Sequence, residues 1–488
     1  MLPKRSFCVG FFVIASVLVS PALLHAQEVA ASVGIQQVVE QSRANDAFWS
    51  VIIRDSTGNI LDAFNADKLV RPASNLKLLT SAMVLDELGP DFRYVTKLYG
   101  IGTLKDSTWH GDIIVRGSGD PSVSGTFYQD DRFYVFNQFY RALDSLGIEH
   151  VNGSLVGNNA YFDQKPYPKG WSWDDLSFYY GVEINALSFN ENTVELSVYA
   201  RNNIGERPNI EWFPFDTDYV DFINEQVITP AYSEYDESYR RIMGTNTILL
   251  RSSLPKNYVE EEALAVLDGA QYFIDTLQKY LAQSGITVES IFVENQPRNW
   301  NSGQYQVLTK HRSVPLAELL EEVNSESNNF YAEMLLKTAA AEHFHTAGST
   351  ELGLRLMEDF AKKMGMETSD LKISDGSGLA PATLLTIEDL SMMLVNMRSH
   401  PYAEAYRHSL SVAGQKGTLK HRFRGTPIAG KLTGKTGYIS GVRALSGYLE
   451  AQSGHPLTFS IVTNNYTEPT SYIDRVQEEI VRKIYQTY

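Results

Sequence analysis

Residues 72–85 read PASNLKLLTSAMVL, and their apolar side chains recur with the spacing of a helix that buries one face. Ser74 lies in the first turn of this predicted helix, and Lys77 follows three residues later. A serine becomes a useful nucleophile only when a neighbouring base accepts its proton, and a lysine at this spacing brings an amine beside the hydroxyl. The stretch therefore predicts a helix with Ser74 as a candidate nucleophile and Lys77 as its candidate base.

The spacing of serine and lysine is not specific by itself. Residues 253–256 and 369–372 match it too, although Pro255 fits poorly inside a helix. Ser74 could also be a helix N-cap that lies beside a solvated lysine. Other motifs must decide between these interpretations.

Two further motifs follow in the order that a serine acyl-transfer enzyme needs. Residues 327–329 (Ser-Asn-Asn) bring a hydroxyl and an amide to a predicted helix start, and residues 435–437 (Lys-Thr-Gly) precede a β-like run. Each alone could be a helix cap or the start of a plain strand, and residues 188–190 repeat the Ser-x-Asn pattern. The ordered set of three is specific, because penicillin-binding proteins and class A β-lactamases combine the same three motifs.

The rest of the chain has the composition of a globular protein. Its 488 residues are 43% hydrophobic and 20% charged, which excludes collagen-like, coiled-coil and wholly disordered chains. This length corresponds to about two to four domains. Residues 47–53 and 60–64 flank a turn and predict a hairpin. Further predicted elements are helices over 315–323 and 328–341 and strands over 442–450 and 457–463.

The chain ends in a predicted amphipathic helix. Ile473, Val476, Ile480 and Ile484 form one apolar stripe on it. Its polar face mixes acidic and basic residues, whereas helices that lie on membranes usually carry a basic face. We therefore expect the stripe to pack against a sheet rather than a membrane.

Between the first two motifs the sequence changes character. From about residue 92 to 295 it has strand-like pieces, many aromatic residues and Gly-rich turns. We predict one domain formed by residues 27–95 and 296–488, and one or two β-rich inserted domains formed by residues 96–295.

Residues 1–26 are predicted to be a cleaved signal peptide. Lys4 and Arg5 form its basic start, residues 11–19 form a short apolar stretch, and residues 24–26 precede the cleavage site. A retained membrane anchor is the alternative, but no apolar stretch approaches the roughly 20 residues that a span needs. The leader predicts a periplasmic protein, with a secreted extracellular form left open.

The mature chain lacks a thiol and is acidic. Cys8, the only cysteine, lies in the leader, which excludes disulfides, cysteine nucleophiles and thiolate metal sites from the mature protein. Without Lys4 and Arg5, 40 basic residues stand against 58 acidic ones, and the net charge is −18. Nucleic-acid binding through phosphate neutralisation is not expected.

Two motifs that could suggest a metal or a nucleotide are set aside. His343 and His345 are two residues apart and do not share a helix face. Residues 425–432 resemble a phosphate loop but lack the Ser or Thr that would bind magnesium. We expect no metal and no cofactor.

Nearly the whole mature chain resembles the penicillin-binding protein 4-like D-alanyl-D-alanine carboxypeptidases and endopeptidases, the low-molecular-mass class C penicillin-binding proteins. Besides the three motifs, the resemblance is carried by residues 117–121 (Gly-Ser-Gly-Asp-Pro), 169–171 (Lys-Gly-Trp) with Asp174 and Asp175, 375–379 (Asp-Gly-Ser-Gly-Leu) and 417–419 (Gly-Thr-Leu). The 253 positions from Ser74 to Ser327 fit it too, because this family has extra domains inserted there. The resemblance implies an α+β fold: a serine β-lactamase/transpeptidase-like domain, an antiparallel sheet covered by helices, with β-rich inserted domains.

The resemblance also implies a catalytic role for five residues. Lys77 would accept the proton of Ser74 while the Ser74 hydroxyl attacks the carbonyl of the penultimate D-alanine. Its amine would be kept unprotonated near Ser327, Asn329 and Lys435. A free lysine has a pKa of about 10.4, so burial and a like charge must lower it. Water would then hydrolyse the acyl-enzyme from the side of Ser327 and Lys77.

Substrate binding would fall to the third motif. Lys435 and Thr436 would hold the terminal carboxylate of the substrate. Gly437 and Tyr438 would line the same site, and the backbone N–H groups of Ser74 and Tyr438 would hold the oxyanion.

Two positions depart from the family pattern. Tyr438 is large where family members often carry a small hydroxyl residue, and it could narrow the edge of the cleft. Asn158 is neutral where related proteins often place an aspartate that grips the amino end of a diamino acid. Asn158 could equally be an ordinary turn asparagine.

The expected function is hydrolysis of the peptide stem of peptidoglycan in the cell envelope, with β-lactam antibiotics as covalent inhibitors. A non-catalytic peptidoglycan-binding protein and a β-lactamase or esterase on the same framework are the alternatives. The choice between carboxypeptidase and endopeptidase, the oligomeric state and peripheral association with membrane or cell wall stay open.

Overall fold

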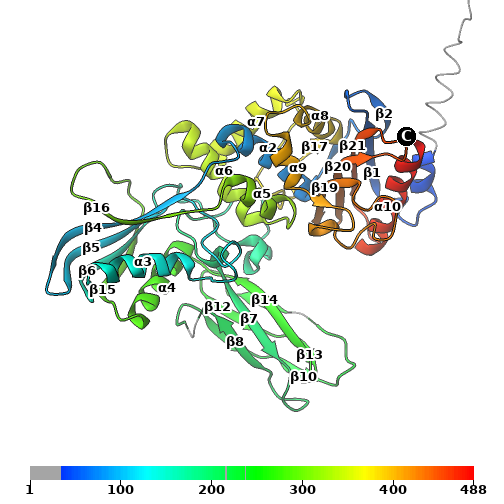
Figure 1. Ribbon diagram of the computed structural model, residues 1–488. Helices are drawn as coiled ribbons and strands as arrows, with labels where there is room; N and C mark the ends of the chain where they lie inside the picture. The colour runs from blue at the N-terminus through cyan, green and yellow to red at the C-terminus, as the bar shows by residue number, and fades with distance from the viewer. Residues whose placement is uncertain (1–33, 215–216, 237) are drawn as a thin grey trace, which may run out of the picture.

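A six-stranded antiparallel sheet forms one end of the protein. The computed structural model describes residues 34–214, 217–236 and 238–488, so the predicted signal peptide lies outside the described residues. In sheet order the strands are β18 (Ser411–Val412), β19 (Leu432–Ile439), β20 (Val442–Glu450), β21 (Pro456–Asn464), β1 (Phe48–Arg54) and β2 (Ile60–Phe64). The predicted hairpin is confirmed as β1 and β2, and β20 and β21 confirm the two predicted C-terminal strands (Figure 1).

Helices cover both faces of this sheet. On one face Val51 and Ile53 of β1 pack with Ile480 of α10 (Thr470–Thr487), and the helical residues 34–40 join the same core. On the other face Ile52 packs with Ile387, the first residue of α8 (Ile387–Met397). Alternating side chains of one strand point to opposite faces, so both faces of β1 are apolar. The predicted packing of the terminal helix on the sheet is confirmed.

The helix that begins with the first motif lies at the centre of the molecule. It is α2 (Leu76–Leu88), and every residue from Leu76 to Leu85 is buried, so the expected single buried face is wrong. A helix that is buried all round belongs in the interior of a large domain. The surrounding helices are α5 (Leu316–Asn324), α6 (Asn329–Phe344), α7 (Thr350–Lys363), α8 and α9 (Ala403–His408).

The inserted region contains a second, five-stranded sheet. Its order is β15 (Thr287–Glu294), β6 (His150–Asn158), β5 (Thr108–Arg116), β4 (Val95–Lys105) and β16 (Gln306–Arg312). Strand β16 lies beyond the predicted boundary at residue 295, yet it pairs with β4 and extends the sheet to Arg312. Only His311 of this edge strand is buried, so its sequence lacks the apolar alternation that would assign it to the sheet.

Two helices accompany the strands of the β-rich insertion. Strands β5, β6 and β15 run parallel, and parallel neighbours need a crossover connection. The crossovers contain α3 (Tyr134–Ser145) and α4 (Gly269–Gln283), whose Phe136 and Phe273 pack in one core with Leu155 of β6.

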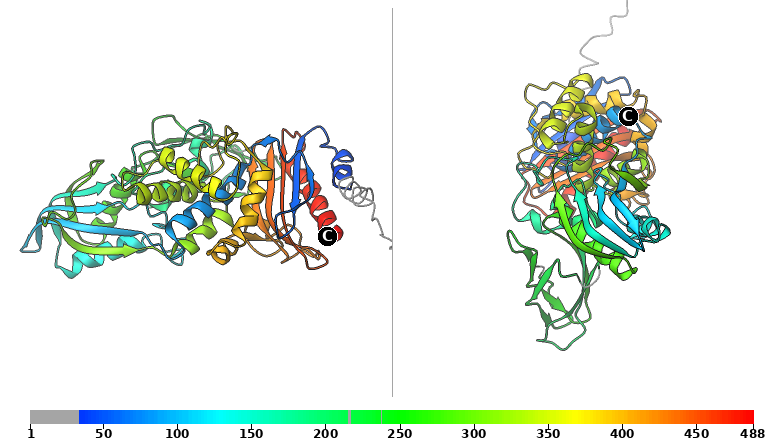
Figure 2. Two further views of the ribbon diagram at one scale, coloured as in Figure 1. Left: turned by 90° about the horizontal axis from the view of Figure 1, so that it is seen from above. Right: turned by 90° about the vertical axis from the view of Figure 1, so that its left-hand side faces the viewer.

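Smaller sheets complete the insertion and extend it away from the helices (Figure 1). They are β14 (Val259–Ala265), β7 (Thr193–Tyr199) and β8 (Asn209–Phe213); β11 (Tyr239–Arg241), β12 (Thr247–Leu250) and β9 (Asp221–Asn224); and β10 (Val227–Thr229) with β13 (Ser253–Pro255). The remaining pair, β3 (Leu69–Val70) and β17 (Leu385–Thr386), joins the N-terminal and C-terminal sequence segments that form the main domain. Figure 2 shows the resulting elongated molecule, with the six-stranded sheet and the insertion at opposite ends.

Candidate active site

Ser74 lies in a short 3-10 turn, η1 (Ala73–Asn75), that leads directly into α2. Strand β19 passes so close to this turn that a Cβ on Gly437 would come within 2.8 Å of the Pro72 carbonyl oxygen. The third motif therefore needs glycine at this position, because any side chain would push the strand away from the nucleophile turn. Packing of η1 against β19 fixes Ser74 at the edge of the six-stranded sheet.

Lys77 is fully buried in the first turn of α2, and its amine contacts three oxygens. The Nζ atom lies 3.0 Å from Ser74 Oγ, 2.6 Å from Asn329 Oδ1 and 2.8 Å from the carbonyl oxygen of Ser377. The two carbonyl oxygens can only accept hydrogen bonds, whereas a serine hydroxyl can also donate. A neutral amine that donates to both carbonyls therefore has its lone pair directed at the hydroxyl of Ser74.

Asn329, the first residue of α6, is held in the orientation that this arrangement needs. Its Nδ2 donates to the Tyr180 carbonyl oxygen at 2.9 Å, which turns Oδ1 toward Lys77. Asn328 caps the helix by accepting a hydrogen bond from the Tyr331 N–H at 3.2 Å. Ser327 precedes them with a φ of 68°, so the second motif is a tight turn into a helix.

Burial lowers the pKa of Lys77 to about 7, and the nearby Asp375 opposes that shift without cancelling it. A lysine with this pKa is a substantial fraction neutral at physiological pH, as a general base must be. Burial also lowers the pKa of Lys435 well below its ordinary value, and the amine of Lys77 lowers it further.

Lys435 and Thr436 lie on β19, on the other wall of the site. Lys435 is fully buried, and its Nζ donates to the Thr436 carbonyl oxygen at 2.9 Å. The Thr436 hydroxyl donates to Thr418 Oγ1 at 2.8 Å, and Thr418 contacts Ser411 Oγ at 3.1 Å. From the sequence, residues 417–419 contribute only to the family resemblance and have no predicted role. In the structure, Thr418 lies in η5 (Gly417–Leu419) and orients the hydroxyl of Thr436.

These residues open into a cleft of about 880 Å³ between the main domain and the insertion. Tyr438 lies on its rim with 55% of its surface exposed. The residues that line the cleft are Arg71, Ser74, Ser172, Asp174, Asp175, Tyr179, Tyr180, Glu326, Ser327, Asn328, Asn329, Leu379, Pro381, Thr418, Thr436, Tyr438, Ile439, Ser440 and Arg443. Lys77 and Lys435 lie buried beneath this surface.

Asn158 does not line the cleft. It is the last residue of β6 and 3% exposed, and its Nδ2 donates to Glu294 at 2.6 Å and to the Gln296 carbonyl at 2.9 Å. Its hydrogen bonds therefore hold β6 to the edge strand β15 of the five-stranded sheet, and of the two interpretations of Asn158 the structure favours the structural one. The carboxylates of the insertion that do line the cleft are Asp174 and Asp175.

The competing motifs lie on the wrong kinds of element. Ser253 begins strand β13, and Ser369 lies in the connection between α7 and β17, so neither is followed by a helix that places a lysine beside it. Among the described residues no group of three or more His, Cys, Asp or Glu is arranged to hold a metal ion. The described part of the chain also contains no helix long and apolar enough to cross a membrane.

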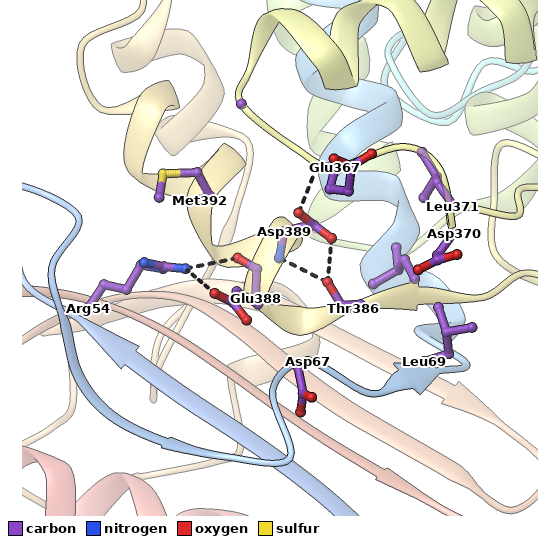
Figure 3. Close-up of a pocket in the computed structure, with 12 residues that line it drawn as sticks. Arg54, Asp67, Leu69, Glu367, Asp370, Leu371, Thr386, Glu388, Asp389 and Met392 are labelled. Carbon is purple, nitrogen blue, oxygen red and sulfur yellow. Dashed lines mark hydrogen bonds and ion pairs between the residues drawn. The ribbon is translucent and has the colours of Figure 1, made fainter.

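A second cavity, of about 280 Å³, is lined by acidic side chains but contains none of the predicted site residues (Figure 3). Its carboxylates join α8 to neighbouring elements: Glu388 pairs with Arg54 at 3.9 Å, and Asp389 accepts the Glu367 N–H at 2.8 Å. Glu388 and Asp389 thus have structural roles in the fold.

Comparisons with known proteins identify the family and the relatives of the chain. The model of the D-Ala-D-Ala carboxypeptidase 3 (S13) family matches residues 31–483. A D-alanyl-D-alanine carboxypeptidase of Actinomadura sp. is 31% identical over 455 residues, which cover 89% of this chain and 81% of the relative. The D-alanyl-D-alanine carboxypeptidase DacB of Haemophilus influenzae is 25% identical over 421 residues, 84% of this chain and 83% of the relative.

A solved structure shares the whole architecture. The crystal structure of penicillin-binding protein 4 from Haemophilus influenzae superimposes with a TM-score of 0.81 at 22% sequence identity, and the match covers 92% of this chain and 99% of that chain. The α+β fold with inserted domains is therefore confirmed.

Proposed function

The chain belongs to the D-Ala-D-Ala carboxypeptidase 3 (S13) family, and from the geometry of its cleft we propose that Ser74 is the nucleophile of the reaction. The enzyme is a serine-type D-Ala-D-Ala carboxypeptidase or D,D-endopeptidase that acts on peptidoglycan stem peptides. The observation that carries the assignment of Ser74 is the amine of Lys77. Two carbonyl oxygens at 2.6 and 2.8 Å take its hydrogens, and its lone pair is left for the Ser74 hydroxyl at 3.0 Å.

Acylation then follows from the positions of these groups. The Oγ of Ser74 attacks the carbonyl carbon of the penultimate D-alanine, and its proton passes to the neutral amine of Lys77. The backbone N–H groups of Ser74 and Tyr438 hold the negative oxygen of the tetrahedral intermediate. When the intermediate collapses, the C–N bond breaks and the leaving amine takes a proton from the side of Lys77 and Ser327. Water hydrolyses the resulting ester and restores the free enzyme.

The terminal carboxylate of the substrate is held by Lys435 and Thr436. Burial disfavours the charged form of Lys435, and an anion at the neighbouring Thr436 hydroxyl would favour it again. Substrate binding therefore supplies the negative charge that this buried amine needs. The hydrogen bond from the Thr436 hydroxyl to Thr418 holds the Thr436 side chain in position before the substrate binds.

The hydrolytic activity is tested with two synthetic peptidoglycan substrates, a stem peptide that ends in D-Ala-D-Ala and a D-alanyl cross-linked dimer. We expect release of D-alanine from the first substrate or cleavage of the second, followed by mass spectrometry. A stem peptide that ends in L-alanine is the control and should stay intact. Folded protein that cleaves neither D-alanyl substrate would contradict the proposal and favour a non-catalytic peptidoglycan-binding protein.

We assign recognition of the substrate's diamino acid to the carboxylates of the insertion. Asp174 and Asp175 line the cleft. Burial raises the pKa of Asp175, and the charge of Asp174 raises it further. A cationic amine beside two neighbouring carboxylates would relieve their repulsion. This role replaces the one considered for Asn158, which is bound to Glu294.

Asp175→Asn is expected to lower kcat/KM for a stem peptide with a free side-chain amine by roughly tenfold, because a hydrogen bond to a charged group contributes about 1.5–3 kcal/mol. The same peptide with an acetylated amine should be cleaved equally by both proteins. Asp218→Asn, an exposed change on the insertion, is the matched control. Equal losses on both peptides would refute a role in amine recognition.

We also place the enzyme in the periplasm, after removal of residues 1–26. A substrate in the cell wall and the basic and apolar composition of the leader support this location. The intact mass of exported protein used in the peptide assay reports whether the mature chain begins at Gln27.

A further inference from the structure

A buried carboxyl on α6 anchors the loop that orients the catalytic amine. Glu333 lies one helical turn after Asn329 and is completely buried. Its Oε1 accepts hydrogen bonds from the backbone N–H groups of Gly376 and Ser377, both at 2.8 Å. The carbonyl of the same Ser377 accepts the hydrogen bond from Lys77. Glu333 is thus connected to the base through two residues of backbone.

The neighbouring Asp375 is surrounded by hydrogen-bond donors. Its two oxygens accept hydrogen bonds from the Ala380 N–H at 2.8 Å, the Ser377 hydroxyl and Trp171 Nε1 at 3.1 Å, the Gly378 N–H at 3.2 Å and the Thr383 hydroxyl at 3.3 Å. Both oxygens of Asp375 are thus fully occupied as hydrogen-bond acceptors, which ties the loop to the residues that follow it.

Glu333 has the surroundings of a neutral acid. Its Oε2 is buried and has no hydrogen-bond partner among the described residues, so an anion here would be poorly solvated. Burial raises the pKa of Glu333 to about 8, and the charge of Asp375 adds to the shift. Ionisation of Glu333 would bring a second negative charge next to Asp375 in a buried site, at a large cost in free energy.

We propose that Glu333 is a positioning residue for the acylation step, an inference that rests on the proposed role of Ser74 and Lys77. Its neutral carboxyl holds Gly376 and Ser377 in position, so that the Ser377 carbonyl accepts a hydrogen bond from one N–H of Lys77. A charged carboxyl in its place would stabilise the ammonium form of Lys77 and deprive Ser74 of its base.

The other charged groups around Glu333 leave this arrangement intact. Lys77 faces it from α2 and Asp375 faces it from the loop. Lys337, one turn further along α6, directs its amine to Asp163 at 2.8 Å and to the Lys165 carbonyl at 2.7 Å. The loop has a second anchor, because the hydroxyl of Thr80 on α2 donates to the Gly376 carbonyl oxygen at 2.6 Å.

The test is the rate constant of acylation by a fluorescent penicillin between pH 5.5 and 9. Glu333→Gln keeps a neutral acceptor for both N–H groups, so its rate should stay within about fivefold of the unmodified protein, with the same pH midpoint. Glu333→Ala frees the loop and should slow acylation on the order of 10²-fold, as small displacements of catalytic groups do. Glu342→Gln, at the exposed end of the same helix, is the matched control and should change nothing.

The final labelled fraction separates positioning from folding. Slow acylation of Glu333→Ala that still reaches a full endpoint supports the proposal, whereas a reduced endpoint reached at the normal rate indicates a purely structural role and overturns it. A shift of the pH midpoint by about one unit in Glu333→Gln would show a charged carboxyl and overturn its neutral state.

A second variant keeps the test decisive if Glu333→Ala does not fold. Thr80→Val removes only the second anchor of the loop and should slow acylation by roughly tenfold. A normal rate in Thr80→Val would then count against control of Lys77 by this loop. Absence of labelling in the unmodified protein would instead refute the proposed function itself.

Discussion

Ser74→Ala is expected to abolish the covalent adduct with benzylpenicillin and to lower hydrolysis of D-alanyl peptides by on the order of 10⁴-fold or more. The alanine variant keeps η1, α2 and the cleft but has no atom that can form the ester. Lys77 would then lack the hydroxyl that its lone pair faces and whose proton it would take. Intact-mass analysis over time, with excess benzylpenicillin, measures the result directly.

Two alanine variants of the competing motifs are the controls. Ser253→Ala lies in β13 and Ser369→Ala lies between α7 and β17, so both should acylate like the unmodified protein. A lasting mass increase equal to one benzylpenicillin molecule, present in the unmodified protein and both controls and absent from Ser74→Ala, establishes Ser74 as the nucleophile. A transient adduct with turnover of the drug would favour a β-lactamase, and an adduct that survives in Ser74→Ala would contradict the assignment.

Local features of the site could be predicted from the sequence because short segments determine them. The helix after Ser74, the helix start at Asn329 and the strand that contains Lys435 each follow from the residues within a few positions. Their order along the chain then indicates the reaction class. The hairpin of β1 and β2 and the packing of α10 follow in the same way from periodicity.

Contacts of backbone groups between distant segments could not be predicted. The Ser377 carbonyl that binds Lys77 comes from a residue 300 positions away, and every residue has a carbonyl, so no residue type marks it. The burial of residues 76–85 on all sides of α2 depends on five helices that surround it, and β16 joins β4 across more than 200 positions. Such features depend on the assembled fold, and the anchoring of residues 376 and 377 by Glu333 is one of them.

Lys77→Arg is expected to slow acylation by roughly 10³-fold, within the range that general bases contribute. A guanidinium stays protonated throughout the accessible pH range and has no lone pair to take the proton of Ser74. Lys372→Arg, the lysine of the competing 369–372 motif, is the matched control and should acylate normally. The measurement is the second-order rate constant of acylation by benzylpenicillin at pH 8.

The pH dependence of the acylation rate tests whether the slow acylation of Lys77→Arg results from loss of the buried amine. Because burial places the pKa of Lys77 at about 7, the neutral base predominates above pH 7 and is lost as the pH falls through that value. Acylation of the unmodified protein should therefore decline about tenfold per pH unit below 7 and level off above it. Lys77→Arg should lack this inflection, since its guanidinium does not titrate there. An unchanged inflection in Lys77→Arg would assign the base to another group, because a titration that persists without the amine cannot belong to it.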